Sequence, residues 1–305
     1  MKPLSTSLPV AQVPRIALRE RLADYVALTK PRLSTLSVMT AFFGYLAAKP
    51  AWAWSTLLSL LAGSALAAGG AAALNMWLER KPDARMRRTA DRPLAAGRLH
   101  VAEVAVAGFV FSLLGVVILW VGTTPLAALL ALLTVAIYAA AYTPLKRVGA
   151  LATEVGAVSG ALPPLIGWAA AGELSPLLGA YLFAILFLWQ LPHFMSISWL
   201  YRDDYRRGGF AMLAVKDEAG DRVAGISWGY SLALIVMAPL PLLWGAATIW
   251  YALAAVGVSV WQACAAYRFL KGGARAAAAR SLFLRSVSYL PLLLVLFVLD
   301  RFLLL

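Results

Sequence analysis

Long apolar windows, separated by short segments that contain charged residues, Gly or Pro, dominate this sequence of 305 residues. A bilayer core roughly 30 Å thick needs about 20 apolar residues per helical span. Nine such windows occur, over residues 33–48, 54–78, 101–122, 125–143, 148–171, 176–200, 223–244, 246–268 and 282–304. In lipid the backbone must satisfy its own hydrogen bonds, and the windows lack the alternation of barrel strands. We therefore predict an all-α, polytopic membrane protein with about nine transmembrane helices.

The composition supports the same fold class. Hydrophobic residues make up 62% of the chain and charged residues only 13%. A soluble domain of this size could not bury so much apolar surface in one core. Membrane lipid is therefore the expected surrounding of the helices.

The net charge of +13 would suggest nucleic acid only if the basic residues formed one solvated face. Of the 27 Lys and Arg residues, 25 lie in the N-terminal arm or in the loops after the second, fourth, sixth and eighth windows, and the two exceptions are Lys49 and Arg301. By the positive-inside rule this pattern places the N-terminus in the cytoplasm and the C-terminus on the opposite side. We expect a multi-pass protein of the cell (inner) membrane with no nucleic-acid partner.

Residues 1–24 are basic but lack an apolar stretch followed by a small-residue cleavage site, so they are expected to form a cytoplasmic N-terminal arm. No linker divides the rest, so residues 25–305 are expected to form one transmembrane domain. The single cysteine, Cys264, allows neither a disulfide framework nor a cysteine metal site.

Acidic and amide side chains recur at every fourth position near the end of the second window, at Asn75, Glu79 and Asp83. On a helix they share one face with about 6 Å of rise between neighbours, which suits oxygen ligation of one or two Mg²⁺ ions. Pro82 predicts that the helix kinks or ends at Asp83. The nearby Arg88 and Arg92 suit contacts to a diphosphate. The alternative is a set of ordinary salt-bridging charges at the membrane interface.

A second acidic loop, with Asp203, Asp204 and Tyr205, lies on the same side of the membrane in the predicted topology. Adjacent aspartates cannot share one helical face, so we expect one of them to point into a shared site. Lys146 and Arg147 are further candidate diphosphate contacts, or equally membrane anchors on the basic side.

The sixth window contains Trp189, Gln190, Pro192 and His193. An ionisable residue inside a membrane is energetically costly and by default indicates a function, here substrate binding or proton handling. The alternative is a structural histidine that is hydrogen-bonded beside a proline kink.

These segments together resemble the UbiA superfamily of intramembrane prenyltransferases, and within it the protohaem IX farnesyltransferase branch. The similarity rests on five segments: Asn75 to Leu94, Tyr142 to Arg147, Gly160 to Trp168, Trp189 to Phe194, and Asp204 with Tyr205. The resemblance implies a helical bundle of the UbiA type around a cytoplasm-facing cavity.

The resemblance also implies the reaction. Farnesyl diphosphate would lose diphosphate with the help of Mg²⁺, and the farnesyl group would be added to a vinyl group of protohaem IX (haem B), a substrate and not a cofactor, to give haem O. A downstream haem-modifying membrane enzyme could receive the product. The metal ligands implied are Asn75, Glu79, Asp83 and Asp204, which with Arg88 and Arg92 form the catalytic set. The substrate-binding residues implied are Lys146, Arg147, Trp189, Gln190, His193 and Tyr205.

One departure bears on the choice between branches. The fourth residue after Asp203 is Arg207 and the fourth after Asp204 is Gly208, so the second Asp-x-x-x-Asp of quinone prenyltransferases is missing. This difference favours the haem branch over enzymes that act on a quinone precursor or chlorophyllide. A secondary transporter is a weaker alternative, because transporters usually carry their ionisable sites near the midplane of the membrane.

Overall fold

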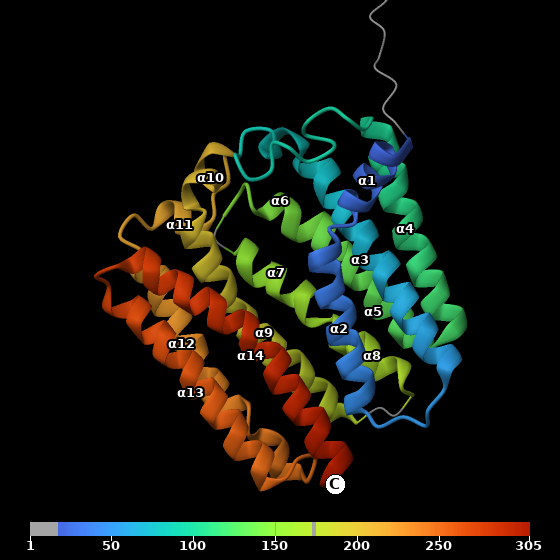
Figure 1. Cartoon of the computed structure of the whole chain (residues 1–305), viewed down its shortest axis with the longest axis vertical. Helices are drawn as coiled ribbons and strands as arrows, with labels where there is room; N and C mark the ends of the chain where they lie inside the picture. Colours follow the sequence, from blue (N-terminus) through green and yellow to red (C-terminus); the bar gives the residue numbers. More distant parts are fainter. Residues whose placement is uncertain (1–17, 150, 173–174) are drawn as a thin grey trace, which may run out of the picture.

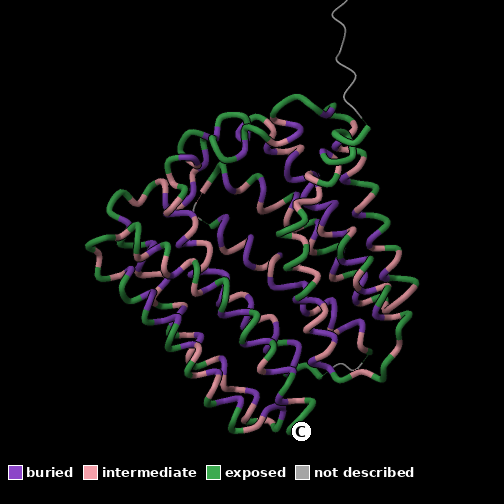
Figure 2. The backbone as a smooth tube through the Cα atoms, viewed as in Figure 1, coloured by how far each residue is buried: buried purple, intermediate pink, exposed green. Residues whose placement is uncertain are grey.

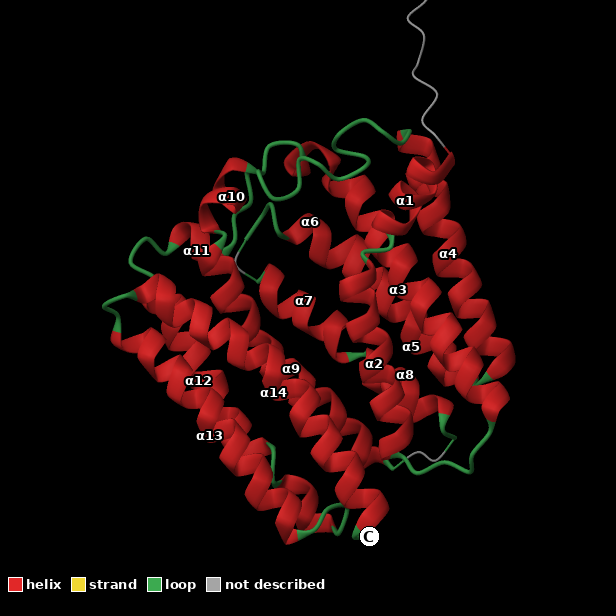
Figure 3. Cartoon of the chain, viewed as in Figure 1, coloured by secondary structure: helices red, strands yellow, loops and turns green. Residues whose placement is uncertain are grey.

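The computed structural model describes residues 18–149, 151–172 and 175–305, and every regular element in these ranges is a helix (Figure 3). The longer helices are α1 (Leu18–Leu28), α2 (Pro31–Ala47), α3 (Trp54–Asp83), α4 (Val101–Gly122), α5 (Pro125–Ala136), α7 (Ala152–Ala161), α8 (Pro163–Ala170), α9 (Pro176–Leu200), α12 (Asp221–Met237), α13 (Ile249–Lys271) and α14 (Arg275–Leu303). Short elements are the π-helix η1 (Ile137–Tyr142), α6 (Thr143–Leu145), α10 (Arg202–Arg207), α11 (Leu213–Lys216) and the 3₁₀ helix η2 (Leu240–Trp244). The predicted all-α fold class is confirmed.

Seven helices in the described ranges are long and apolar enough to cross a membrane. Of the other two predicted windows, residues 33–48 correspond to α2, which has 17 residues, and residues 148–171 are divided between α7 and α8. The break lies at Leu162 and Pro163, where the proline ring cannot continue the hydrogen-bond ladder of α7. The protein is therefore a multi-pass helical membrane protein, and the count of nine crossings stays a prediction.

The helices form two packed groups (Figure 1). One hydrophobic cluster joins α2, α3, α4, α5 and α8, and another is centred on α9, α13 and α14. Leu46, Trp168 and Ala171 pack against both clusters and so connect the two groups. Figure 2 shows buried residues on the inward faces of the helices and exposed ones on the periphery, which is the surface that lipid would cover.

The loops rich in basic residues gather at one end of the bundle, together with α1, α6, α10 and α11 (Figure 1). We call this the basic end and define it by residues 84–100, 146–149 and 201–220. The C-terminus lies at the opposite end (Figure 1).

Two elements differ from the predicted boundaries. α3 continues to Asp83, beyond the predicted limit at residue 78, and so carries the whole acidic motif on one helix. α1 was not predicted and runs across the expected limit of the arm at residue 24, while residues 1–17 lie outside the described ranges. Its side chains pair with the start of α4 and the preceding loop, through Arg21 with Glu103 at 2.6 Å and Asp24 with Arg98 at 3.0 Å.

The contact between α2 and α8 is made by backbone against backbone. A Cβ atom on Gly44 would lie 2.0 Å from the carbonyl oxygen of Pro164, and one on Gly167 would lie 1.7 Å from that of Ala41. Small residues allow membrane helices to approach closely, because lipid gives no hydrophobic drive for their association. This pair of glycines therefore sets the distance between the two helices.

Gly44→Ala or Gly167→Ala is expected to destabilise the protein, because the neighbouring backbone would have to shift. Overpacking of this kind costs about 1–3 kcal/mol or more. Thermal unfolding in detergent, followed by size-exclusion chromatography, would measure the loss. Gly257→Ala is the matched control, since a Cβ there meets no heavy atom within 4 Å. Equal stability of all three variants would contradict this account of the packing.

Candidate active site

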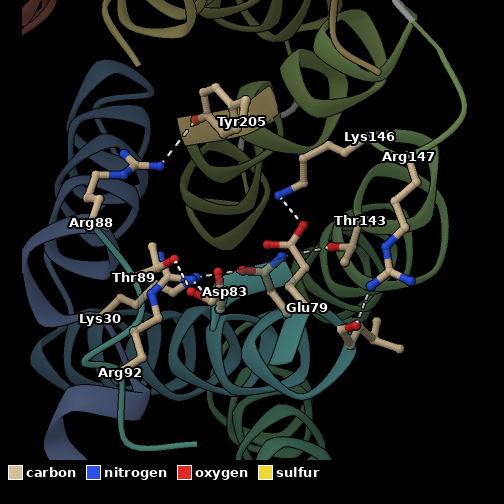
Figure 4. Close-up of polar contacts among 12 residues, drawn as sticks. Lys30, Glu79, Asp83, Arg88, Thr89, Arg92, Thr143, Lys146, Arg147 and Tyr205 are labelled. Atoms are coloured by element: carbon tan, nitrogen blue, oxygen red, sulfur yellow. Dashed lines mark hydrogen bonds and ion pairs between the residues drawn. The ribbon is translucent and has the colours of Figure 1, made fainter. Parts of the chain in front are cut away.

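Asn75, Glu79 and Asp83 lie on successive turns of α3 and are all buried. Their exposed fractions are 1%, 3% and 1%. Figure 4 shows Glu79 and Asp83 at the basic end, among basic side chains from other segments. A buried carboxylate is stable as an anion only when cations or hydrogen-bond donors compensate for its lost hydration. The environment of these three side chains therefore decides what the site can bind.

Each of the three side chains has a cationic partner. Lys146 Nζ lies 2.5 Å from Glu79 Oε1, Arg92 Nη1 donates to Asp83 Oδ2 at 2.6 Å, and Lys30 Nζ donates to Asn75 Oδ1 at 2.6 Å (Figure 4). The other carboxylate oxygen of the aspartate, Oδ1, is buried and has no hydrogen-bond partner among the described residues. The cluster thus pairs the two carboxylates with Lys146 and Arg92 and the amide with Lys30, and it leaves Asp83 Oδ1 without a hydrogen bond from the described residues.

Lys30 belongs to this cluster, although the sequence analysis did not select it. It has a left-handed backbone, with φ 45°, at the junction of α1 and α2. The residue is partly exposed, but its ammonium reaches into the cluster. Burial and the nearby Arg92 guanidinium lower the pKa of Lys30 to about 7, against the opposite effect of Glu79. A lysine before Pro31 carries no local signal of this placement, which depends on how α1 and α2 meet α3.

The π-helix η1 and the short helix α6 position the next part of the site. Asn75 Nδ2 donates to Thr143 Oγ1 at 3.0 Å, and that hydroxyl donates to the carbonyl of Tyr138 at 2.8 Å. π-helical turns are often found at functional sites because they rotate the residues that follow them. Here Thr143 and Lys146 lie beside the acidic face of α3 (Figure 4), and the ring of Tyr142 lies against the Lys146 ammonium.

Lys146 is 7% exposed, yet its surroundings favour the charged form. Burial alone would lower the pKa of Lys146, but the charge of Glu79 and the nearby Tyr138 outweigh it and raise the pKa above its ordinary value. The ammonium also lies 4.6 Å from the ring centroid of Tyr142 and 5.5 Å from that of Phe210.

Asp204 binds the turn that follows α3. Its Oδ1 accepts the backbone N–H of Arg87 and its Oδ2 that of Arg88, both at 3.2 Å, and Arg207 also pairs with Oδ1. Burial opposes ionisation of this carboxyl, but the hydrogen bonds from Arg207 and from the two amides outweigh that effect and lower the pKa of Asp204. Asp204 is buried, whereas the side chain of Asp203 is 67% exposed and pairs with Arg206. The two acidic loops are therefore joined at the same end of the bundle.

Two of the predicted diphosphate contacts point elsewhere. The Arg88 guanidinium lies against the rings of Tyr201 and Tyr205, at 4.7 and 5.5 Å, and donates to the Tyr205 hydroxyl at 3.3 Å. Arg147 donates to the carbonyl of Leu78 at 2.7 Å. Figure 4 shows the first arginine directed at α10 and the second at the backbone of α3.

Trp189, Gln190 and His193 form a separate polar group on α9. Trp189 Nε1 donates to the carbonyl of Ser286 at 2.7 Å, and His193 Nδ1 lies 2.9 Å from its hydroxyl. The indole and imidazole rings are stacked, with centroids 5.1 Å apart. Gln190 Nε2 donates to the carbonyls of Ala157 and Leu186. These partners lie on α7, α9 and α14, so the group is held within the bundle and not by the loops of the basic end.

In the described ranges no group of three His, Cys, Asp or Glu side chains is close enough to hold a metal ion without other ligands. The oxygen donors that converge are those of Glu79 and Asp83, with Asn75 one turn further into the bundle. Hard cations such as Mg²⁺ commonly take only one or two protein carboxylates and complete their shell with water and phosphate oxygens. The available oxygen of Asp83 and the surrounding cations fit that kind of site.

Comparison with known proteins identifies the same family that the sequence motifs resemble. A family model described as the UbiA prenyltransferase family matches residues 37–287. A protoheme IX farnesyltransferase of Opitutus terrae is 48% identical to this chain, over 93% of this chain and 97% of its own. A protoheme IX farnesyltransferase of Solibacter usitatus is 41% identical, over 92% of this chain and 99% of its own.

Solved structures share the fold at low sequence identity. A digeranylgeranylglyceryl phosphate synthase aligns with a TM-score of 0.78 at 15% identity, over 92% of this chain and 99% of its own. A UbiA homolog from Archaeoglobus fulgidus, solved with DMAPP and Mg²⁺, aligns with a TM-score of 0.66 at 12% identity, over 90% of this chain and 99% of its own. These alignments show the shared fold. The family match and the relatives above show that the chain belongs to the UbiA prenyltransferase family.

Proposed function

We propose that this protein transfers the farnesyl group of farnesyl diphosphate to a vinyl group of protohaem IX, giving haem O. The observation that carries the proposal is the buried cluster at the basic end, in which Glu79 pairs with Lys146, Asp83 with Arg92 and Asn75 with Lys30. Such a cluster suits an anion that arrives with a divalent cation. The curated relatives, which are named for this reaction and align over nearly their full length, support haem as the acceptor.

Mg²⁺ would be held by Glu79 and Asp83, with Asn75 as the neighbouring oxygen donor. The ion would supply positive charge to the leaving diphosphate. The Archaeoglobus homolog solved with Mg²⁺ and a prenyl diphosphate supports this choice of ion. For Asp204 the contacts favour a different role, because its oxygens already accept the amides of Arg87 and Arg88. We propose that it fixes the turn after α3, although the sequence suggested a metal ligand.

The cationic side chains would bind the diphosphate and stabilise the charge that develops on it as the C–O bond breaks. Lys146, Arg92 and Lys30 are preorganised for this by their buried partners, and such preorganised charge is usually the largest catalytic contribution. Arg88 and Arg147 would act at the rim of the site, since both are now directed at other partners.

The allylic carbon freed in this way would bond to the terminal carbon of a haem vinyl group. The resulting cation on the adjacent carbon takes a hydroxyl from water, which releases a proton, so that farnesyl diphosphate, haem B and water give haem O and diphosphate. The apolar residues of the two helical groups would shield the farnesyl cation from premature attack by water.

Haem would be bound by the α9 group. Trp189 and His193 present stacked rings in an apolar setting, which suits a flat aromatic macrocycle, and Gln190 holds α9 to α7. Tyr205 lies at the basic end beside Arg88, which belongs to the loop after α3 (residues 84–100). It would contact the diphosphate side of the substrate.

We further propose a location in the cell inner membrane with the basic end in the cytoplasm, so that the N-terminus is cytoplasmic and the C-terminus lies across the membrane. The placement of 25 of the 27 basic residues supports this orientation. Residues 1–24 would form the arm and residues 25–305 the catalytic domain. A downstream haem-modifying membrane enzyme would receive the product. The alternative within the family is a quinone precursor or chlorophyllide as the acceptor.

Purified protein given farnesyl diphosphate, Mg²⁺ and haem B is expected to form haem O, seen by mass spectrometry of the extracted haem. Asp83→Asn and Glu79→Gln should each lower kcat by about 10²–10³-fold, the usual loss when a preorganised charge-stabilising group is removed. Asp203→Asn is the control, since that carboxylate is exposed, and should retain activity. Prenylation of an aromatic acid or chlorophyllide in place of haem would identify the alternative acceptor.

His193→Leu is expected to weaken haem binding by about tenfold, because it removes an imidazole ring that would stack on the macrocycle, a contact worth about 0.5–1.5 kcal/mol. Ser286 and Trp189 hold that ring in place. Titration of haem B into the detergent-solubilised protein, followed by its absorption spectrum, would measure this change. His100→Leu, at the N-terminus of α4, serves as the control. If His193→Leu leaves haem affinity unchanged and only lowers stability, His193 is a structural residue.

A further inference from the structure

The second loop, residues 201–220, contributes an aromatic ring to the candidate active site. Lys146 Nζ, paired with Glu79 of α3, also lies over the ring of Tyr142 at 4.6 Å and over the ring of Phe210 at 5.5 Å. Tyr142 belongs to η1, while Phe210 follows α10, the short helix that carries Asp204. The ammonium is therefore held by a carboxylate and two aromatic rings that come from three separate parts of the chain.

An aromatic ring can hold a lysine ammonium without forming an ion pair with it, so the ammonium stays able to bind an anion. The face of an aromatic ring has a negative electrostatic potential and attracts an ammonium. This attraction is stronger where water is excluded. Unlike a carboxylate, a ring does not neutralise the formal charge of the lysine. It thus orients the ammonium while leaving its charge and its N–H donors for the oxygens of a phosphate group.

Phe210 is itself firmly placed. Its backbone N–H donates to the carbonyl of Tyr205 at 3.0 Å, and the N–H of the next residue, Ala211, donates to the carbonyl of Lys146 at 2.8 Å. Gly209 allows the turn between them, with φ +75°. The ring is 3% exposed and packs with Met86 and Met212. The second loop therefore holds the lysine by its backbone and by its side chain.

We propose that Phe210 is a positioning residue, which together with Tyr142 holds the Lys146 ammonium in place for the diphosphate of the prenyl substrate. The inference rests on the proposed function for the identity of the ligand. It assigns the second loop a part in diphosphate binding that does not depend on its carboxylates. The part requires an aromatic ring, not merely an apolar side chain of similar size.

A double-mutant cycle on the full-length protein in detergent tests this. The probe is farnesyl thiodiphosphate with Mg²⁺, an analogue that is slow to react, and its Kd is measured by isothermal titration calorimetry. Phe210→Leu should weaken binding by about fivefold, within the range for a desolvated cation–π contact. Phe210→Tyr should keep wild-type affinity. In a Lys146→Met background, Phe210→Leu should have no further effect, because the charge that the ring attracts is gone.

Phe183→Leu is the matched control, because that phenylalanine is partly buried against the hydrophobic cluster centred on α9, α13 and α14 and is not among the residues of the proposed site. It should leave the Kd unchanged. If Phe210→Leu fails to fold, as judged by size-exclusion chromatography, the same cycle is run with Tyr142→Leu. That ring is nearer to the Lys146 ammonium than the Phe210 ring is, so the cycle tests the same cation–π contact.

Independent, additive effects of the Phe210 and Lys146 substitutions would overturn the inference while leaving the proposed reaction intact. Equal weakening by Phe210→Tyr and Phe210→Leu would also overturn it, because any change of shape would then suffice. Failure of the wild-type protein to bind the analogue would overturn both the inference and the proposed function.

Discussion

The cost of burying charge governs this structure. Glu79 and Asp83 lie almost fully inside a protein whose surroundings are lipid, where an unpaired carboxylate would be neutralised or would destabilise the fold. Each has a cation beside it: Arg92 from the loop after α3 and Lys146 from the end of α6. Segments far apart in sequence must therefore meet at one end of the bundle before these charges are compensated. The candidate active site is the place where they meet.

Two helical elements, α3 and η1, fix the positions of the side chains in this charged cluster. α3 is continuous through Pro82, so its acidic residues keep a regular spacing up to Asp83. η1 gives the chain an extra residue per turn before Thr143, whose hydroxyl links Asn75 to the carbonyl of Tyr138. Because both elements belong to the packed half of the bundle that contains α2 and α8, the site is held by rigid parts and not by its loops alone.

Periodicity in the sequence was enough to predict the helical fold and the shared face of Asn75, Glu79 and Asp83, since both depend on neighbours along one helix. Features that depend on tertiary contacts could not be predicted from periodicity. Lys30 enters the cluster through the junction of two helices, and Phe210 through a glycine turn. The sequence placed Asp204 at the correct end of the bundle, but nothing local could indicate that it would receive the amides of the first loop.

The length of α3 has a consequence for where the substrate can lie. Its 30 residues extend about 45 Å at 1.5 Å per residue, whereas the hydrocarbon layer measures roughly 30 Å. If Trp54 is placed at one interface, α3 would project about three turns past the other, and those turns carry Asn75 to Asp83. The pyrophosphate end would thus sit at headgroup depth, in reach of water and dissolved ions, while the isoprenoid tail stays among the acyl chains. Inserting or deleting a turn between Trp54 and Asn75 would move that depth by about 5 Å.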